Sequence, residues 1–215
     1  MVGSVPSALC SAAAATRTVP LPRRPLDPDD PADRIRGWYE NELGWATVPG
    51  EPVRLLVGER FDVLDVPAEA GLWALRRLAP GSPVAVGGDR MLLLVAAGGA
   101  EEVPGILQWL EWGALRLDLK AIGAGGLIEA PLRPSGRDQE EGRNPGPERP
   151  EPVQGAAVWL RPPVAGREAE ASLPTMSALG GVGCAPDLVR LVNTLATHCH
   201  RVWLRRASAQ PLSFS

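Results

Sequence analysis

Residues 61–67 read Phe-Asp-Val-Leu-Asp-Val-Pro, and this stretch decides how the rest of the 215-residue chain is interpreted. Its aliphatic and β-branched residues favour a strand over 60–66 that enters a hydrophobic core, and Pro67 ends the strand because proline has no N–H to give to a sheet. Successive side chains of a strand point to opposite faces, so Asp62 and Asp65 are expected on opposite faces of the sheet. The two carboxylates are therefore not expected to share one site.

Helices and strands follow one another around this stretch without strict alternation. Apolar residues at helical spacing predict helices over 33–43, 68–78, 103–112 and from residue 186 onward. Further strands are expected over 53–57, 84–86, 91–95, 115–122, 127–130, 155–160 and, as a short last strand, 202–204. Turn residues join 84–86 to 91–95, and 115–122 to 127–130, as two hairpins. This order predicts an α+β fold with a mostly antiparallel or mixed sheet flanked by helices.

Composition separates one folded domain from its flanking segments. Residues 1–32 are rich in Ala, Ser and Pro and are expected to form a disordered leader. Residues 33–205 are expected to form a single domain, and residues 206–215 a tail. Within the domain, residues 131–152 lack periodicity and are expected to form a mobile loop, because they cannot bury enough apolar surface to offset the entropy cost of ordering.

Charge and cysteine content limit the function classes. The net charge of -3 and the pI of about 5.5 do not indicate a surface that neutralises nucleic-acid phosphates. Three cysteines without a CxxC pair do not indicate a disulfide framework or a zinc ribbon. The N-terminus lacks a signal-peptide pattern, and no stretch reaches the ~18 apolar residues of a transmembrane helix. We therefore expect a cytoplasmic protein that is not embedded in a membrane.

Three segments carry acidic, glycine and basic residues in a distinctive order. The first is 61–67, and the second, 86–92, reads Val-Gly-Gly-Asp-Arg-Met-Leu. The third, 117–121, reads Leu-Asp-Leu-Lys-Ala and leads to Gly-Gly-Leu-Ile-Glu-Ala-Pro at 125–131. Together they resemble the three successive motifs of the primase–polymerase (archaeo-eukaryotic primase-like) domain, and the resemblance covers roughly residues 44–160.

The resemblance implies a nucleotidyltransferase site. In that family the first motif is a strand ending Asp-x-Asp, the second a Gly-Gly turn before a strand with a His, and the third an acidic residue before a Gly-rich hairpin. The carboxylates hold two divalent ions and must project from one face of a sheet. Here Asp65 matches the first Asp, but Pro67 stands at the second, and Met91 stands at the position matched to the His. The sequence therefore resembles a degenerate member.

Asp65 and Asp118 are left as candidate catalytic and metal-binding residues, for Mg²⁺ or Mn²⁺ if the protein is active. Arg90 and Lys120 are candidate phosphate contacts. Arg116, Asp118 and Lys120 alternate with leucines, which puts all three polar side chains on one face of the expected strand. The alternative is that Asp65 caps a turn, and that Arg90 and Lys120 are solvated charges.

Other patterns indicate structure more than chemistry. The glycines at 123–126 fit a hairpin turn better than a dinucleotide loop, because a strand follows them where a helix is required. Adjacent helical side chains in His198-Cys199-His200 diverge and do not favour a zinc site with Cys184, and Cys199 is expected to be half-buried. Five tryptophans are expected in the core rather than as base-stacking platforms: Trp38, Trp45, Trp73, Trp109 and Trp112.

Three functions stay open at this stage. The first is a catalytically impaired primase–polymerase-like domain that binds a nucleotide, a nucleic acid or a protein. The second is an active primase/polymerase with a rearranged site that uses Asp62, Asp65 and Asp118. The third is an adaptor without a nucleic-acid role that recruits protein partners through its disordered segments.

Overall fold

The computed structural model describes residues 27, 30–133, 156–164, 168–176 and 187–208. Nearly all of the predicted leader and most of the predicted 131–152 loop lie outside these residues. No helix among the described residues is long and apolar enough to cross a membrane.

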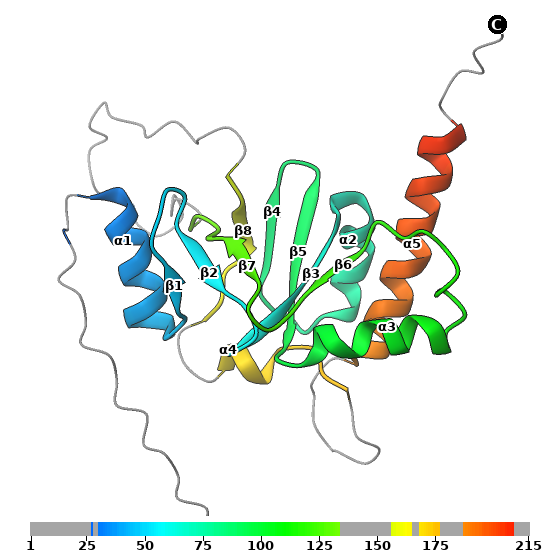
Figure 1. Ribbon diagram of the computed structural model, residues 1–215, viewed down its shortest axis with the longest axis horizontal. Helices are drawn as coiled ribbons and strands as arrows, with labels where there is room; N and C mark the ends of the chain where they lie inside the picture. Colours follow the sequence, from blue (N-terminus) through cyan, green and yellow to red (C-terminus); the bar gives the residue numbers. More distant parts are fainter. Residues whose placement is uncertain (1–26, 28–29, 134–155, 165–167, 177–186, 209–215) are drawn as a thin grey trace, which may run out of the picture.

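Helices and strands follow in the order shown in Figure 1. The helical elements are α1 (Pro31–Gly37), the π-helical η1 (Trp38–Leu43), α2 (Ala68–Ala74), the 3₁₀ turn η2 (Leu75–Arg77), α3 (Gly99–Trp109), α4 (Glu168–Ala171) and α5 (Leu188–Ser208). The strands are β1 (Thr47–Val48), β2 (Arg54–Leu56), β3 (Phe61–Pro67), β4 (Val84–Gly87), β5 (Arg90–Ala96), β6 (Lys120–Ile122), β7 (Leu127–Glu129) and β8 (Val158–Arg161).

The strands form two antiparallel sheets. One has five strands in the order β6-β3-β5-β4-β8, and the other has three in the order β1-β2-β7. Helices α2, α3 and α5 lie on one side of the five-stranded sheet, and the three-stranded sheet with α1 lies on the other (Figure 1). The fold is therefore α+β with antiparallel sheets flanked by helices, as the sequence predicts.

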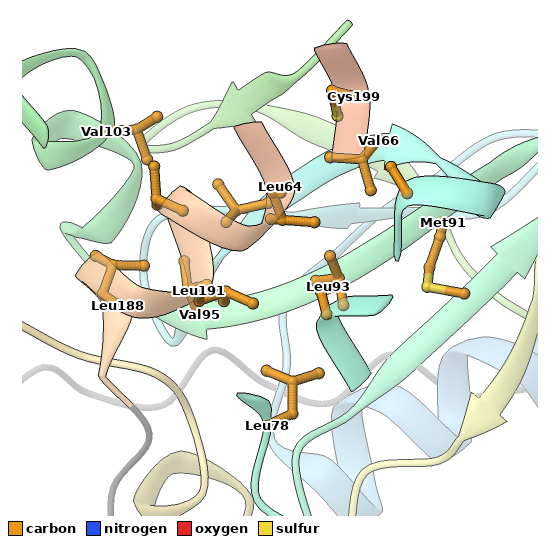
Figure 2. Close-up of a cluster of buried hydrophobic side chains, with 14 of the residues drawn as sticks. Leu64, Val66, Leu78, Met91, Leu93, Val95, Val103, Leu188, Leu191 and Cys199 are labelled. Carbon is orange, nitrogen blue, oxygen red and sulfur yellow. The ribbon is translucent and has the colours of Figure 1, made fainter. Parts of the chain in front are cut away.

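Strand β3 divides the hydrophobic core in two. Leu64 and Val66 point toward the helices and pack with residues of α2 and α5 (Figure 2). Phe61 and Val63 point the other way and pack with residues of η1 and the three-stranded sheet. The alternation of a strand thus serves two cores at once, and β3 is the central element of the fold.

Asp62 lies on the helical side of β3, as its position in the strand predicts. Its side chain is 1% exposed, and Oδ2 accepts a hydrogen bond of 2.9 Å from the backbone N–H of Ala100. Ala100 lies in the first turn of α3, where backbone N–H groups have no partner within the helix. The Asp62 carboxylate accepts a hydrogen bond from one of them, and its negative charge is stabilised by the positive end of the helix dipole. Asp62 is a structural residue that orients α3.

The predicted hairpin between 115–122 and 127–130 is wrong. Only Lys120–Ile122 form a strand there, and β6 pairs with β3 in the five-stranded sheet. Strand β7 pairs with β2 in the three-stranded sheet, where Ile128 is buried in the second core. The glycine turn at 123–126 therefore passes from one sheet to the other, and Gly125 takes a positive φ of 76° within it.

The predicted strand 202–204 and the tail boundary at residue 206 are also wrong. Residues 202–208 all belong to α5, which runs to Ser208. Val202 continues the buried stripe that includes Leu195 and Cys199, so the helical period holds to the last turns. At the other end, the chain turns helical at Pro31, where Asp30 accepts a hydrogen bond from the Ala32 N–H at 2.9 Å.

The Tyr39 hydroxyl connects three segments of the second core, the hydrophobic cluster between the two sheets. The side chain is 0% exposed, and its hydroxyl donates a hydrogen bond to the Pro131 carbonyl at 2.5 Å and accepts one from Trp159 Nε1 at 2.8 Å. Burial raises the pKa of Tyr39, and the bond from Trp159 only partly offsets this. One hydroxyl thus joins η1, β8 and the segment that follows β7.

Tyr39→Phe should therefore lower the free energy of unfolding by roughly 1–3 kcal/mol, since it leaves two buried polar groups without a partner. Urea denaturation followed by circular dichroism measures the change. Trp112→Phe is the matched control, because its indole N–H bonds to Asn193 at an exposed position. Equal effects of the two substitutions would contradict the role given to Tyr39.

Candidate functional site

Asp65, Arg90 and Lys120 lie on neighbouring strands of the five-stranded sheet, on the face opposite the helices, and Asp118 lies just before one of these strands. Asp65 lies near the end of β3, directly opposite Lys120 on β6. Arg90 begins β5 and lies opposite Pro67. Asp118 precedes β6 by two residues and is not itself in a strand, which corrects the predicted strand 115–122. The antiparallel register brings the three motifs together.

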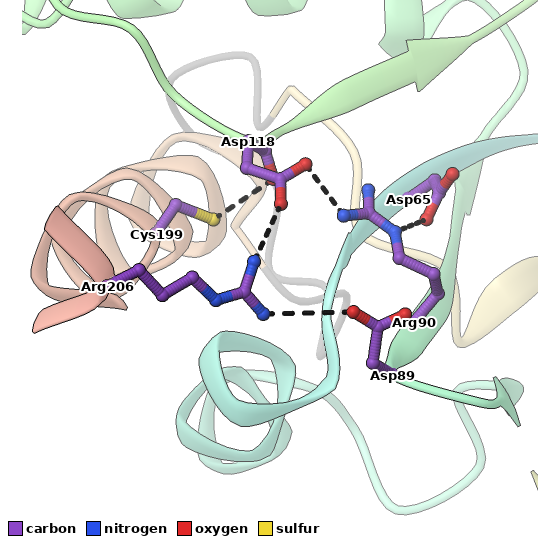
Figure 3. Close-up of polar contacts among 6 residues, drawn as sticks. All are labelled: Asp65, Asp89, Arg90, Asp118, Cys199 and Arg206. Carbon is purple, nitrogen blue, oxygen red and sulfur yellow. Dashed lines mark hydrogen bonds and ion pairs between the residues drawn. The ribbon is translucent and has the colours of Figure 1, made fainter. Parts of the chain in front are cut away.

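Arg90 bridges the two candidate carboxylates (Figure 3). Its Nε lies 2.8 Å from Asp65 Oδ1, and its Nη1 lies 2.6 Å from Asp118 Oδ1. The Arg90 and Asp65 side chains are 29% and 21% exposed. Charge-assisted hydrogen bonds of this length are among the stronger polar contacts in proteins. A single guanidinium therefore occupies the space between the carboxylates.

Arg90 stays a cation wherever the protein is folded. Burial alone would lower its pKa, but the hydrogen bonds and negative charges of Asp65 and Asp118 outweigh burial and raise that pKa above its usual value. The bridge thus does not depend on pH near neutrality.

Arg206 extends the ion network from the last turns of α5. Its Nη1 lies 3.7 Å from Asp118 Oδ2, and its Nη2 lies 3.7 Å from Asp89 Oδ2 (Figure 3). The sequence gives no role to Arg206, which is far from the three motifs along the chain, or to Asp89, which lies in the glycine turn of the second motif. The one signal for Arg206 in the sequence is the cluster of arginines at 201, 205 and 206, close to the end of the C-terminal helix.

Cys199 connects α5 to the same segment. Its Sγ lies 3.5 Å from the Asp118 carbonyl oxygen, and the residue is fully buried, not half-buried as predicted. Burial raises the pKa of Cys199 to about 12, the charge of Asp118 adds to the rise, and Arg90 opposes it. The thiol therefore stays protonated at neutral pH and acts as a packing residue.

Met91, matched to the family His, does not face the site. It is 1% exposed and points into the helical core (Figure 2), where a Cβ on Gly71 would come within 2.3 Å of its Sδ. Arg90, one residue earlier, is the side chain on the Asp65 face. Arg90 and Met91 are neighbours in β5, so their side chains point to opposite faces of the sheet.

The residues present do not fit a two-metal site. Pro67 offers no ligand, Asp62 points to the other face, and Arg90 already binds Asp65 and Asp118. Across the described ranges, no group of three or more His, Cys, Asp or Glu residues could hold a metal ion. Two carboxylates shared with a guanidinium are a poor set for hard divalent cations, which need several oxygen ligands.

The side chains of the His198-Cys199-His200 segment diverge, as expected of helical neighbours. His198 stacks on Trp73 with ring centroids 4.8 Å apart, whereas His200 stacks on Trp203 at 5.8 Å. Cys184 lies outside the described residues. The two imidazoles are held by different aromatic partners and do not converge.

No family model matches the chain, and neither a curated protein nor a solved structure matches it. The arrangement of Asp65, Arg90 and Asp118 is therefore what the functional argument rests on.

Removing the Arg90 side chain leaves two carboxylates close together without their shared cation. Arg90→Ala should lower the free energy of unfolding by roughly 1–3 kcal/mol, the cost of losing hydrogen bonds to charged groups. Combined with Asp118→Ala, it should show a coupling of about 1 kcal/mol in a double-mutant cycle measured by urea denaturation.

Arg60→Ala is the control for this cycle. Arg60 pairs with Glu170 at 2.6 Å, but the two side chains are 50% and 39% exposed, so we expect a loss below about 1 kcal/mol. Additive effects of Arg90→Ala and Asp118→Ala would contradict the bridge.

Proposed function

We propose that this chain is a primase–polymerase-like domain that does not transfer nucleotides and serves as a binding module. The observation that carries the proposal is the Arg90 guanidinium between Asp65 and Asp118. In the family that the motifs resemble, the corresponding carboxylates hold divalent ions. Here a permanent cation of the chain itself takes that place.

Charge balance supports this reading. Three carboxylates, from Asp65, Asp89 and Asp118, are paired with the guanidinium groups of Arg90 and Arg206. A divalent ion would have to displace Arg90 and would then find two protein carboxylates, which is too few to hold and orient two ions. An active site built from Asp62, Asp65 and Asp118 lacks its third ligand, since Asp62 is buried against α3.

The contacts of Arg90 and Lys120 support nucleotide binding less well than protein binding. Arg90 is a candidate phosphate contact, but Nε and Nη1 of its guanidinium already donate to the carboxylates of Asp65 and Asp118. Lys120 is exposed beside Asp65 and could meet a phosphate only as a single charge next to an anion. These contacts favour a protein partner over a triphosphate, in a cytoplasmic setting.

A primer-extension assay tests the proposal. The purified chain, a primed DNA template and all four deoxynucleotides should give no extension with either Mg²⁺ or Mn²⁺, because the site lacks the ligands for two-metal catalysis. An active polymerase in the same buffer controls for the substrates. Extension that is lost in Asp118→Ala would overturn the proposal, since it would show that the carboxylate works in catalysis.

A further inference from the structure

A groove lies between α2 and α5, on the helical side of the molecule. It has a volume of about 510 Å³ and is lined by Glu69, Trp73, His198, Arg201, Leu204 and Arg205. Helix α2 packs along α5, so the groove follows two rigid elements. Asp65 and Arg90 project from the opposite face of the sheet and do not line the groove, whereas Arg206 of the ion network is the neighbour of Arg205 in α5.

Large apolar side chains are exposed in and beside this groove. Trp73 is 50% exposed and Leu204 is 47% exposed, although the sequence pattern placed Trp73 in the core. Leu72, next to Trp73 on α2, is 56% exposed. The Trp73 ring is held by the stacked His198, and the Arg76 guanidinium lies 5.7 Å from its centroid. Gathered apolar side chains on a surface indicate an interaction site.

The groove carries positive charge in a chain whose net charge is -3. Arg201 and Arg205 line it, and α5 contains no Asp or Glu from Leu188 to Ser208. Glu69 is the one acid among the described lining residues, and it is paired with Arg205 at 2.5 Å. Burial lowers the pKa of His198, and the charges of Arg201 and Arg205 lower it further. The local field therefore favours a ligand with carboxylates.

We propose that this groove docks an acidic amphipathic segment of a protein partner, with apolar side chains on Trp73 and Leu204 and carboxylates on Arg201 and Arg76. This inference deepens the proposed function and rests on its binding-module role. The exposed Trp73 and Leu204 side chains match apolar side chains of a peptide, as in helix-in-groove recognition. Bases have less to gain here, because His198 already stacks on the Trp73 ring.

Fluorescence anisotropy with the full chain tests the proposal. The probe is a labelled peptide of roughly four helical turns, with Leu on one face and Glu on the other. It should bind, and a version with Lys in place of every Glu should not. Trp73→Ala and Arg201→Glu should each weaken binding roughly tenfold or more, as expected for Trp and Arg anchors.

Matched controls use exposed residues outside the groove. Trp109→Ala on α3 removes a tryptophan that is 75% exposed, and Arg190→Glu reverses a charge at the other end of α5. Both should bind the Glu peptide like the unmodified chain, and circular dichroism verifies that every variant is folded.

The proposal is overturned if the Glu peptide does not bind, if the Lys peptide binds as well, or if the controls lose as much affinity as the groove variants. Binding of an oligo-dT strand in preference to the peptide, with the same loss in Trp73→Ala, would assign the groove to single-stranded nucleic acid instead. Primer extension tests whether the Arg90 site supports catalysis, and fluorescence anisotropy tests whether the groove binds the peptide. Failure of one proposal is therefore distinguished from failure of the other.

Discussion

The guanidinium of Arg90, held between Asp65 and Asp118, is the interaction on which the account depends. It joins β3, β5 and the segment before β6, which are the three places where the motifs lie. A cation built into the chain neutralises carboxylates that would otherwise repel one another or attract metal. The same contact thus explains how the fold can hold both aspartates close together.

The arrangement around this contact follows from the alternation of one strand. Leu64 and Val66 anchor the helices to one face of β3, and Asp62 orients α3 there. Asp65 points the other way, to the ion network. Helix α5 serves both sides, because its apolar stripe fills the helical core while Arg206, near its end, reaches Asp118 and Asp89. Its remaining exposed face, with α2, forms the cationic groove.

Patterns local in the sequence predicted much of this structure. The strand predicted over 60–66, the opposite faces of Asp62 and Asp65, and the helix after residue 186 all depend on spacing alone. Spacing alone does not show which sheet a strand joins. The turn at 123–126 therefore fits a hairpin in the sequence, whereas in the structure it connects strands of two different sheets. Which of the neighbours Arg90 and Met91 faces the site depends on how β5 sits in the sheet, and the structure buries Met91 in the helical core. The exposure of Trp73 depends on how α2 packs against α5. Arg206 enters the site only through tertiary contacts.

Titration with Mn²⁺, followed by electron paramagnetic resonance, tests most directly whether Arg90 stands in place of a metal. The account predicts that the unmodified chain leaves Mn²⁺ free, and that Arg90→Ala gains a weak site, since Asp65 and Asp118 are then without their cation. That gained site should be lost again when Asp118→Ala is added. Binding of Mn²⁺ by the unmodified chain, abolished by Asp118→Ala, would contradict the account.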